Sequence, residues 1–260
     1  MSLRKFSATW LNAKGREGSG LVSTDPSILV ASVDAAESGR AKGSAWAMSV
    51  DSQLFDDKLQ LRAEYARTDY DFNTSDSLAS ENDNAYSLSA MFSDTTASGL
   101  NWNMGLENSE VGTFFKSLAN QGLPSDQWRL HAFAGSQWSN FGLQGDYQKL
   151  KDNVNNIAEL PEIETDISSL SANWAPVMAS NDGWLGSPSL SGVYSRQTQD
   201  QNSTPVGYLL AKTNNELDNW QANAIFSYPS LNWGIGLADS KFRDHSALQH
   251  NTNTHRVFSN

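Results

Sequence analysis

The sequence predicts an all-β protein, an antiparallel up-and-down transmembrane β-barrel of about 12 strands. Stretches of about ten residues recur along the chain, and in each of them apolar and polar side chains alternate. Successive side chains of a strand point to opposite faces, so each stretch has one apolar and one polar side. The gaps between stretches alternate between short and long, as in a barrel with short periplasmic turns and long extracellular loops. The stretches also suit a tilted membrane-spanning strand, which needs roughly 9–11 residues.

The strands expected in the first half each show this alternation. In order they are 4–13, with Phe6, Ala8 and Trp10 on one side; 43–51, whose two sides are equally apolar; 57–69, with Leu59, Leu61, Ala63 and Tyr65; 84–93, with Tyr86, Leu88, Ala90 and Phe92; 98–107, with Leu100, Trp102, Met104 and Leu106; and 126–138, with Trp128, Leu130, Ala132, Ala134 and Trp138.

The second half continues the pattern. Its expected strands are 140–149, with Phe141, Leu143 and Tyr147; 165–176, with Leu170, Ala172 and Trp174; 187–197, with Leu190 and Tyr194; 217–228, with Trp220, Ala222, Ala224, Phe226 and Tyr228; 230–240, with Leu231, Trp233, Ile235 and Leu237; and a partial strand at 253–260. The expected long connections are 14–42, 70–83, 108–125, 150–164 and 198–216. The expected short ones are 52–56, 94–97, 139–140, 177–186 and 229–230, and the two classes alternate without exception.

Composition agrees with a barrel and narrows the classes of function. Only 38% of the 260 residues are hydrophobic, and the mean hydropathy is −0.50. A polar lumen lowers the average hydropathy of a barrel in this way. No apolar window is long enough for a membrane-spanning helix. The net charge of −11 argues against binding of nucleic acid, and cysteine is absent.

We expect a single domain over 1–260, and we expect it to be the C-terminal part of a longer exported chain. The opening residues MSLRKFSATW have no apolar core of a signal peptide, yet a barrel reaches the outer membrane only after export. One alternative is a signal peptide that has been removed, and the other is a protein that was never exported.

Several stretches resemble the barrel portion of large, poorly characterised Gram-negative surface proteins. They are LQLRAEYARTDYDF at 59–72, LNWNMGLE at 100–107, VGTFFKSLAN at 111–120 and KDNVNN at 151–156. The resemblance implies an address in the outer membrane and no particular activity.

Six charged residues on polar sides are expected to face the lumen: Arg62, Glu64, Arg129, His131, Asp146 and Lys149. In an open channel such side chains tune ion selectivity, whereas in a filled barrel they form salt-bridged packing. His131 could act as an acid or base with a loop carboxylate, but a hydrogen-bonded lumen side chain is the favoured interpretation. We therefore expect no catalytic residue.

The segment 108–125 is unusually apolar for an outside loop. Its Phe114, Phe115 and Lys116 are candidates for a plug or constriction, formed if the loop folds into the lumen. The alternatives are a partner-binding patch and simple packing against a neighbouring loop.

Aromatic side chains near strand ends are candidates for the two girdles that mark membrane interfaces. They are Trp102, Trp128, Trp138, Tyr147, Trp174, Trp220, Tyr228 and Trp233. No metal site is expected, because His245, His250 and His255 lack ligand spacing. The acidic residues of 69–84 do not match a calcium loop.

These observations predict an integral protein of the bacterial outer membrane that serves as a membrane anchor or as a passive or translocation pore. The expected partners are outer-membrane lipid, lipopolysaccharide and upstream domains of the same polypeptide, without a cofactor. One alternative is a soluble β-sandwich that binds carbohydrate through Trp and Tyr side chains. A second alternative is an outer-membrane barrel hydrolase that uses His131.

Overall fold

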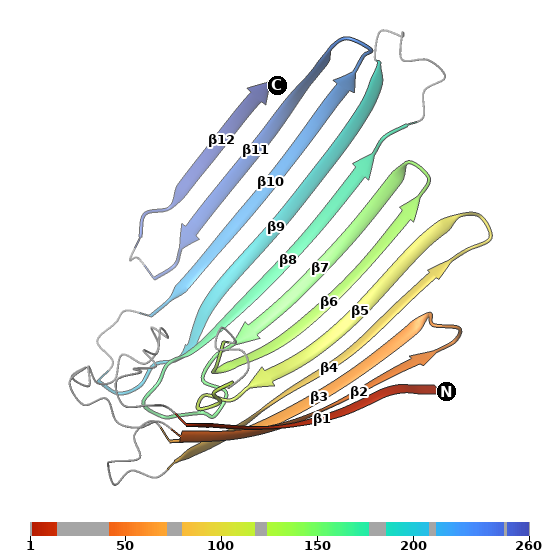
Figure 1. The fold of residues 1–260 in the computed structure, drawn as a ribbon. Coiled ribbons are helices and arrows are strands. Elements are labelled where there is room, and N and C mark those ends of the chain that lie inside the picture. The colour runs from red at the N-terminus through yellow and green to blue at the C-terminus, as the bar shows by residue number, and fades with distance from the viewer. Residues whose placement is uncertain are drawn as a thin grey trace.

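The computed structural model describes residues 2–14, 42–71, 80–117, 124–176, 186–207, 212–246 and 249–259. These residues form one antiparallel sheet of twelve strands, in which each strand pairs with its neighbours in the chain (Figure 1). The prediction of an all-β, up-and-down arrangement of about 12 strands is therefore confirmed. The order also differs from a β-sandwich, because the described strands belong to a single sheet rather than to two packed ones.

Each expected stretch overlaps one of the twelve strands, although the ends differ by up to six residues. The strands are β1 (Ser2–Lys14), β2 (Lys42–Leu54), β3 (Leu59–Asp71), β4 (Glu81–Thr95), β5 (Leu100–Val111), β6 (Gln127–Trp138), β7 (Phe141–Lys151), β8 (Glu162–Trp174), β9 (Ser187–Ser203), β10 (Asn214–Ser227), β11 (Asn232–Asp244) and β12 (Thr252–Ser259).

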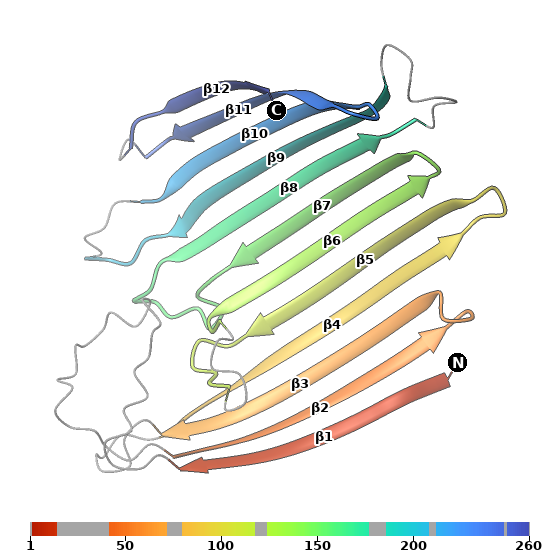
Figure 2. The same ribbon diagram turned by 45° about the horizontal axis from the view of Figure 1, so that its top comes forward.

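The sheet is twisted and curved but not closed. Among the described residues β1 pairs only with β2, and β12 pairs only with β11. These two strands form opposite edges of the sheet (Figure 2). The start of β1 and the end of β12 lie at the end of the sheet that carries the short turns (Figure 1). The fold is thus an open twelve-stranded meander, and the described strands do not form a closed barrel.

The short turns use residues that accept a left-handed backbone. Phe55, Asp56 and Asp57 between β2 and β3 all have positive φ, as do Gly99 (φ 81°) between β4 and β5 and Ser139 (φ 48°) between β6 and β7. Asp, Gly and Ser are frequent in tight turns because they tolerate such dihedrals or cap the backbone locally.

One connection breaks the expected alternation. The connection 175–186, between β8 and β9, is longer than 152–161, which joins β7 to β8 at the opposite end. The expectation that short and long gaps alternate without exception is therefore wrong at this place. The reason is that the alternation of side chains predicts where the strands lie, but it carries no information about the length of the connections between them.

The sheet has almost no conventional core. Among the described residues, Tyr70 and Phe115 are the buried hydrophobic side chains, with 3% and 6% of their surface exposed. Most of the large exposed apolar side chains lie on one face of the sheet. An exposed apolar surface of this kind is typical of a face that binds a membrane or another protein.

Candidate functional site

The apolar face is continuous because the register places like residues opposite one another. Across the middle of the sheet, Leu106 on β5 pairs with Ala132 on β6, which pairs with Tyr147 on β7. Towards the edge, Leu190 on β9 pairs with Ala224 on β10. A one-residue slip would move every one of these side chains to the other face, so the register is tied to this surface. We call this surface the apolar face.

Aromatic side chains form two rows on the apolar face. The row near the short turns contains the stacked pairs Phe92–Trp102 and Phe226–Trp233, whose ring centroids are 4.9 and 4.4 Å apart. The row nearer the long loops contains the pair Trp46–Tyr65, at 5.2 Å. The other members, by strand register, are Trp138, Phe141 and Trp174 near the turns and Trp10, Trp128, Tyr147, Tyr194 and Trp220 towards the loops.

Seven of the eight expected girdle residues lie on strands with their side chains on the apolar face. The eighth, Tyr228, follows the end of β10 at Ser227 and lies in the turn, where its N–H donates to the carbonyl of Leu231. Sequence reasoning left out Trp10, Trp46, Phe92, Phe141 and Phe226 as girdle residues, although they share the same face and rows. The separation of the rows fits a bilayer on β6: Trp128 and Trp138 are ten residues apart, or about 33 Å of strand and roughly 25 Å of height at a barrel tilt.

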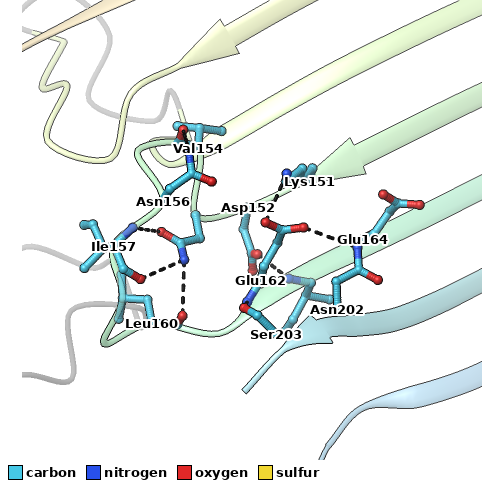
Figure 3. A network of polar contacts seen from close by, with 12 residues as sticks. Lys151, Asp152, Val154, Asn156, Ile157, Leu160, Glu162, Glu164, Asn202 and Ser203 are labelled. Atoms are coloured by element: carbon cyan, nitrogen blue, oxygen red, sulfur yellow. Dashed lines mark hydrogen bonds and ion pairs between the residues drawn. The ribbon is translucent and has the colours of Figure 1, made fainter. Parts of the chain in front are cut away.

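Beyond the aromatic row, the same face becomes charged towards the long loops. The Nζ of Lys149 lies 2.6 Å from the Oε1 of Glu164. The Nζ of Lys151 lies 3.0 Å from the Oε2 of Glu162 (Figure 3). On the next strands Arg196 pairs with Glu216 at 3.0 Å, and Arg243 pairs with Asp218 at 2.8 Å. The face is therefore apolar over part of its height and ionic above it.

The opposite face of the sheet, the polar face, carries five of the six residues expected in the lumen. The prediction is wrong for Lys149, which pairs with Leu130 and lies on the apolar face because it follows Tyr147 by two residues on β7. His131 on β6 places its Nε2 2.7 Å from the Oδ2 of Asp146 on β7, and Arg129 lies 3.2 Å from Glu107 on β5. Arg62 contacts Glu64 on its own strand, and its Nε lies 3.7 Å from Asp51. Each charge thus faces an opposite one. This arrangement resembles salt-bridged packing more than a ring of free charges.

The partner of His131 is a strand carboxylate rather than a loop carboxylate. Among the hydrogen bonds of the described residues, His131 bonds Asp146 and contacts the ring of Phe133, with centroids 5.6 Å apart. It has no bonded serine or threonine, which a hydrolase of the Ser–His type would need.

The best-buried part of the described molecule lies at the long-loop end, over the polar face of β3 and β4. The backbone N–H of Lys116 donates to the Oγ1 of Thr68, which is only 2% exposed. The N–H of Phe114 donates to the Oδ2 of the buried Asp83 at 2.9 Å. The segment 112–117 therefore crosses from the end of β5 onto the polar face of the two preceding strands.

A second loop joins this segment through the same carboxylate. The Nδ2 of Asn155 donates to the Oδ2 of Asp83 at 3.0 Å. Asp126 makes a parallel link, since its Oδ1 accepts from the Oγ1 of Thr113 and from the N–H of Val154. We call this set, Asp83, Asp126, 112–116 and 153–155, the loop latch. Its two carboxylates hold the loop after β5 against the loop after β7.

The loop after β7 is itself ordered by side-chain hydrogen bonds (Figure 3). The buried Asn153 accepts from the N–H of Ile157 at 2.7 Å and donates to the carbonyls of Ile157 and Leu160. Asp152 accepts from the N–H of Ile163 at 2.5 Å. Burial raises the pKa of the Asp152 carboxyl, and the nearby charge of Asp126 adds to the rise.

The remaining candidates contribute less. In the acidic loop, Asp76 lies outside the described residues, and Asp83 serves the loop latch. His255 pairs with Asp239 on the neighbouring strand. Over the described residues no group of three His, Asp or Glu side chains is placed to hold a metal ion. None of the described segments is a helix that could span a membrane.

Comparisons of the chain with protein-family models, with curated proteins and with solved structures find no match. The stretches 59–71, 112–117 and 151–156 are distant in sequence, and the structure brings Thr68, Phe114 and Asn155 to one place.

Proposed function

We propose that the twelve strands close into a β-barrel in a bacterial outer membrane, and that this barrel is a membrane anchor whose interior is narrowed at the long-loop end. The apolar face would contact lipid, and the polar face would line the interior. The resemblance to barrel regions of Gram-negative surface proteins points to the same location.

The observation that carries the proposal is the zoning of the apolar face. A band of apolar side chains lies between two rows of aromatic residues, and ion pairs begin beyond the row nearer the long loops. A bilayer imposes this sequence of zones, because its hydrocarbon core excludes charge while its interfaces favour Trp and Tyr. A protein partner on the same face would not require aromatic rows at two levels.

Closure is supported by the two edges. Because the number of strands is even, β1 and β12 run antiparallel to each other, as barrel closure requires. Both edges carry exposed apolar residues, including Trp10, which is 66% exposed, and Val257. An open edge in a membrane would leave backbone N–H and C=O groups without partners, and closure supplies them.

The role of an anchor is favoured by the loop latch and by the paired charges of the polar face. Both fill interior space with satisfied polar groups rather than leaving a wide charged channel. A narrow pore is the second candidate. It is favoured by a polar hollow of about 580 Å³ on the polar face near the short turns.

Two measurements test the proposal. Folded barrels resist SDS without heating, so the unheated protein should migrate differently from the boiled protein on a gel. In planar bilayers an anchor should give no conductance steps or only small ones, whereas large steady steps would favour the pore. A chain that stays monodisperse in buffer without detergent and does not enter vesicles would contradict both roles.

A further inference from the structure

The hollow near the short turns has a lining that the role of an anchor does not explain. It lies over β4 to β8, at the opposite end of the sheet from the loop latch. Its floor is built from two register rows of the polar face. One row runs through Asn103, Gly135, Gln144 and Ser171, and the other runs through Asn101, Gln137, Gly142 and Asn173. We call the five amide residues of these rows the amide ladder.

The glycines of the two rows leave space on the floor of the hollow, which the neighbouring amide side chains occupy. A Cβ at Gly135 would lie 2.6 Å from the Oδ1 of Asn103, and a Cβ at Gly142 would lie 2.5 Å from the Oε1 of Gln137. Because these positions have no side chain, the amides of neighbouring strands lie across them. The result is a shallow floor of hydrogen-bonding groups, with glycine on β6 in one row and on β7 in the other.

Several side-chain amides of the ladder have donors and acceptors that are not used in hydrogen bonds. Within the described residues, the side chains of Asn103, Gln144 and Asn173 have no hydrogen-bond partner, while Asn101 accepts from Thr95 and Gln137 donates to the carbonyl of Ser139. Each free amide offers a donor and an acceptor. The ladder carries no formal charge. The charged lining residues Asp56, Asp57, Lys58 and Asp94 stand at the turn edge, where Lys58 pairs with Asp94 at 2.8 Å.

We propose that the amide ladder binds a linear, uncharged oligosaccharide that lies across the strands. Sugar hydroxyls are both donors and acceptors, as the amides are, and a neutral ligand needs no counter-charge. Adjacent strands are spaced by about 4.8 Å, close to the length of one pyranose unit, whereas an extended peptide advances only about 3.3 Å per residue. The volume of about 580 Å³ falls in the usual range for ligand sites. The argument uses only the polar face, so it does not depend on the membrane location.

The test is calorimetric titration of the full chain, in detergent or in plain buffer, with cellotetraose and with maltotetraose. Tetraglycine serves as the peptide comparison. We expect at least one of the two sugars to bind at submillimolar concentration and tetraglycine to bind at least tenfold more weakly. Saturation-transfer NMR on the unaltered protein gives a second readout that needs no variant, and it should show transfer to the sugar ring protons.

Variants locate the site. N103A, Q144A and N173A should each weaken binding of the sugar at least fivefold, because each removes a free amide from the floor. Q148A is the matched control, since Gln148 shares strand β7 and the polar face with Gln144 but lies outside the hollow. Its effect should stay below twofold. The proposal is overturned if neither sugar binds, if tetraglycine binds as tightly, or if Q148A weakens binding as much as Q144A.

Discussion

The ring of Tyr70 on β3 covers Gly43 on β2, its direct partner across the strands. A Cβ at residue 43 would lie 2.6 Å from the Cδ2 of the tyrosine ring, which is closer than real atoms approach. Two other direct pairs on the polar face have the same form: Phe133 over Gly105 and Phe258 over Gly236. A bare glycine weakens a strand, and an aromatic neighbour that covers it restores packing. In each pair, the aromatic ring therefore packs over the glycine of the neighbouring strand.

Substituting Gly43 with alanine should destabilise the protein by about 1–3 kcal/mol, because the added methyl group forces the Tyr70 ring out of its position. Urea unfolding of the folded protein measures the change. G192A is the matched control, since a Cβ there would meet its nearest neighbour at 3.9 Å. Equal loss of stability in the two variants would show that the ring has no special role.

Replacing Asp83 with alanine should release the loop latch. The change leaves the N–H of Phe114 and the amide of Asn155 without their acceptor, at a cost of about 2–4 kcal/mol. Protease cleavage between β5 and β6 should become faster, as mass spectrometry of the fragments would show. E159A alters an exposed carboxylate in the loop of Asn155 and should leave cleavage unchanged. If cleavage of the Asp83 variant is unaltered, Asp83 does not hold the loop after β5 in place.

The raised pKa of Asp152 predicts a pH dependence of a definite sign. The folded state favours the protonated carboxyl, so the ionised form at neutral pH destabilises the loop, and this penalty fades as the pH falls. Asp152→Asn keeps an acceptor for the N–H of Ile163 and removes the charge. We expect the variant to be more stable than the parent at pH 7 and to lose that advantage near pH 3. Thermal unfolding at the two pH values measures this, and an advantage that grows at low pH would contradict it.

A charge on the apolar face should be costly only if that face contacts lipid. Leu106 on β5 is 52% exposed, so in water a lysine there would cost little. In a bilayer, L106K should destabilise by about 2–4 kcal/mol. N103K, on the same strand but the polar face, is the control and should be nearly neutral. Equal stability of both variants would mean that Leu106 faces water.

The strands and their faces could be predicted because successive side chains of a strand point to opposite faces, so that apolar and polar residues alternate in the sequence. The alternation of Trp102, Met104 and Leu106 with polar residues predicts β5 and its apolar side, and it needs no information from other strands. The loop latch could not be predicted, since Asp83 and Asn155 meet only after the four strands β4 to β7 have paired in register. The glycine–aromatic pairs could not be predicted either, because they depend on the register between two strands, and the sequence of one strand does not give that register. The sequence pattern likewise carries no signal for the length of the connection 175–186.

The most direct test of the central claim is a nitroxide scan of β5, which a chain without cysteine permits through single cysteine substitutions. With the protein in lipid vesicles, labels at 102, 104 and 106 should collide mainly with oxygen dissolved in the bilayer. Labels at 101 and 103 should collide mainly with a water-soluble nickel complex. Equal access of the nickel complex to both sets would show that water bathes both faces, and the membrane barrel would have to be abandoned.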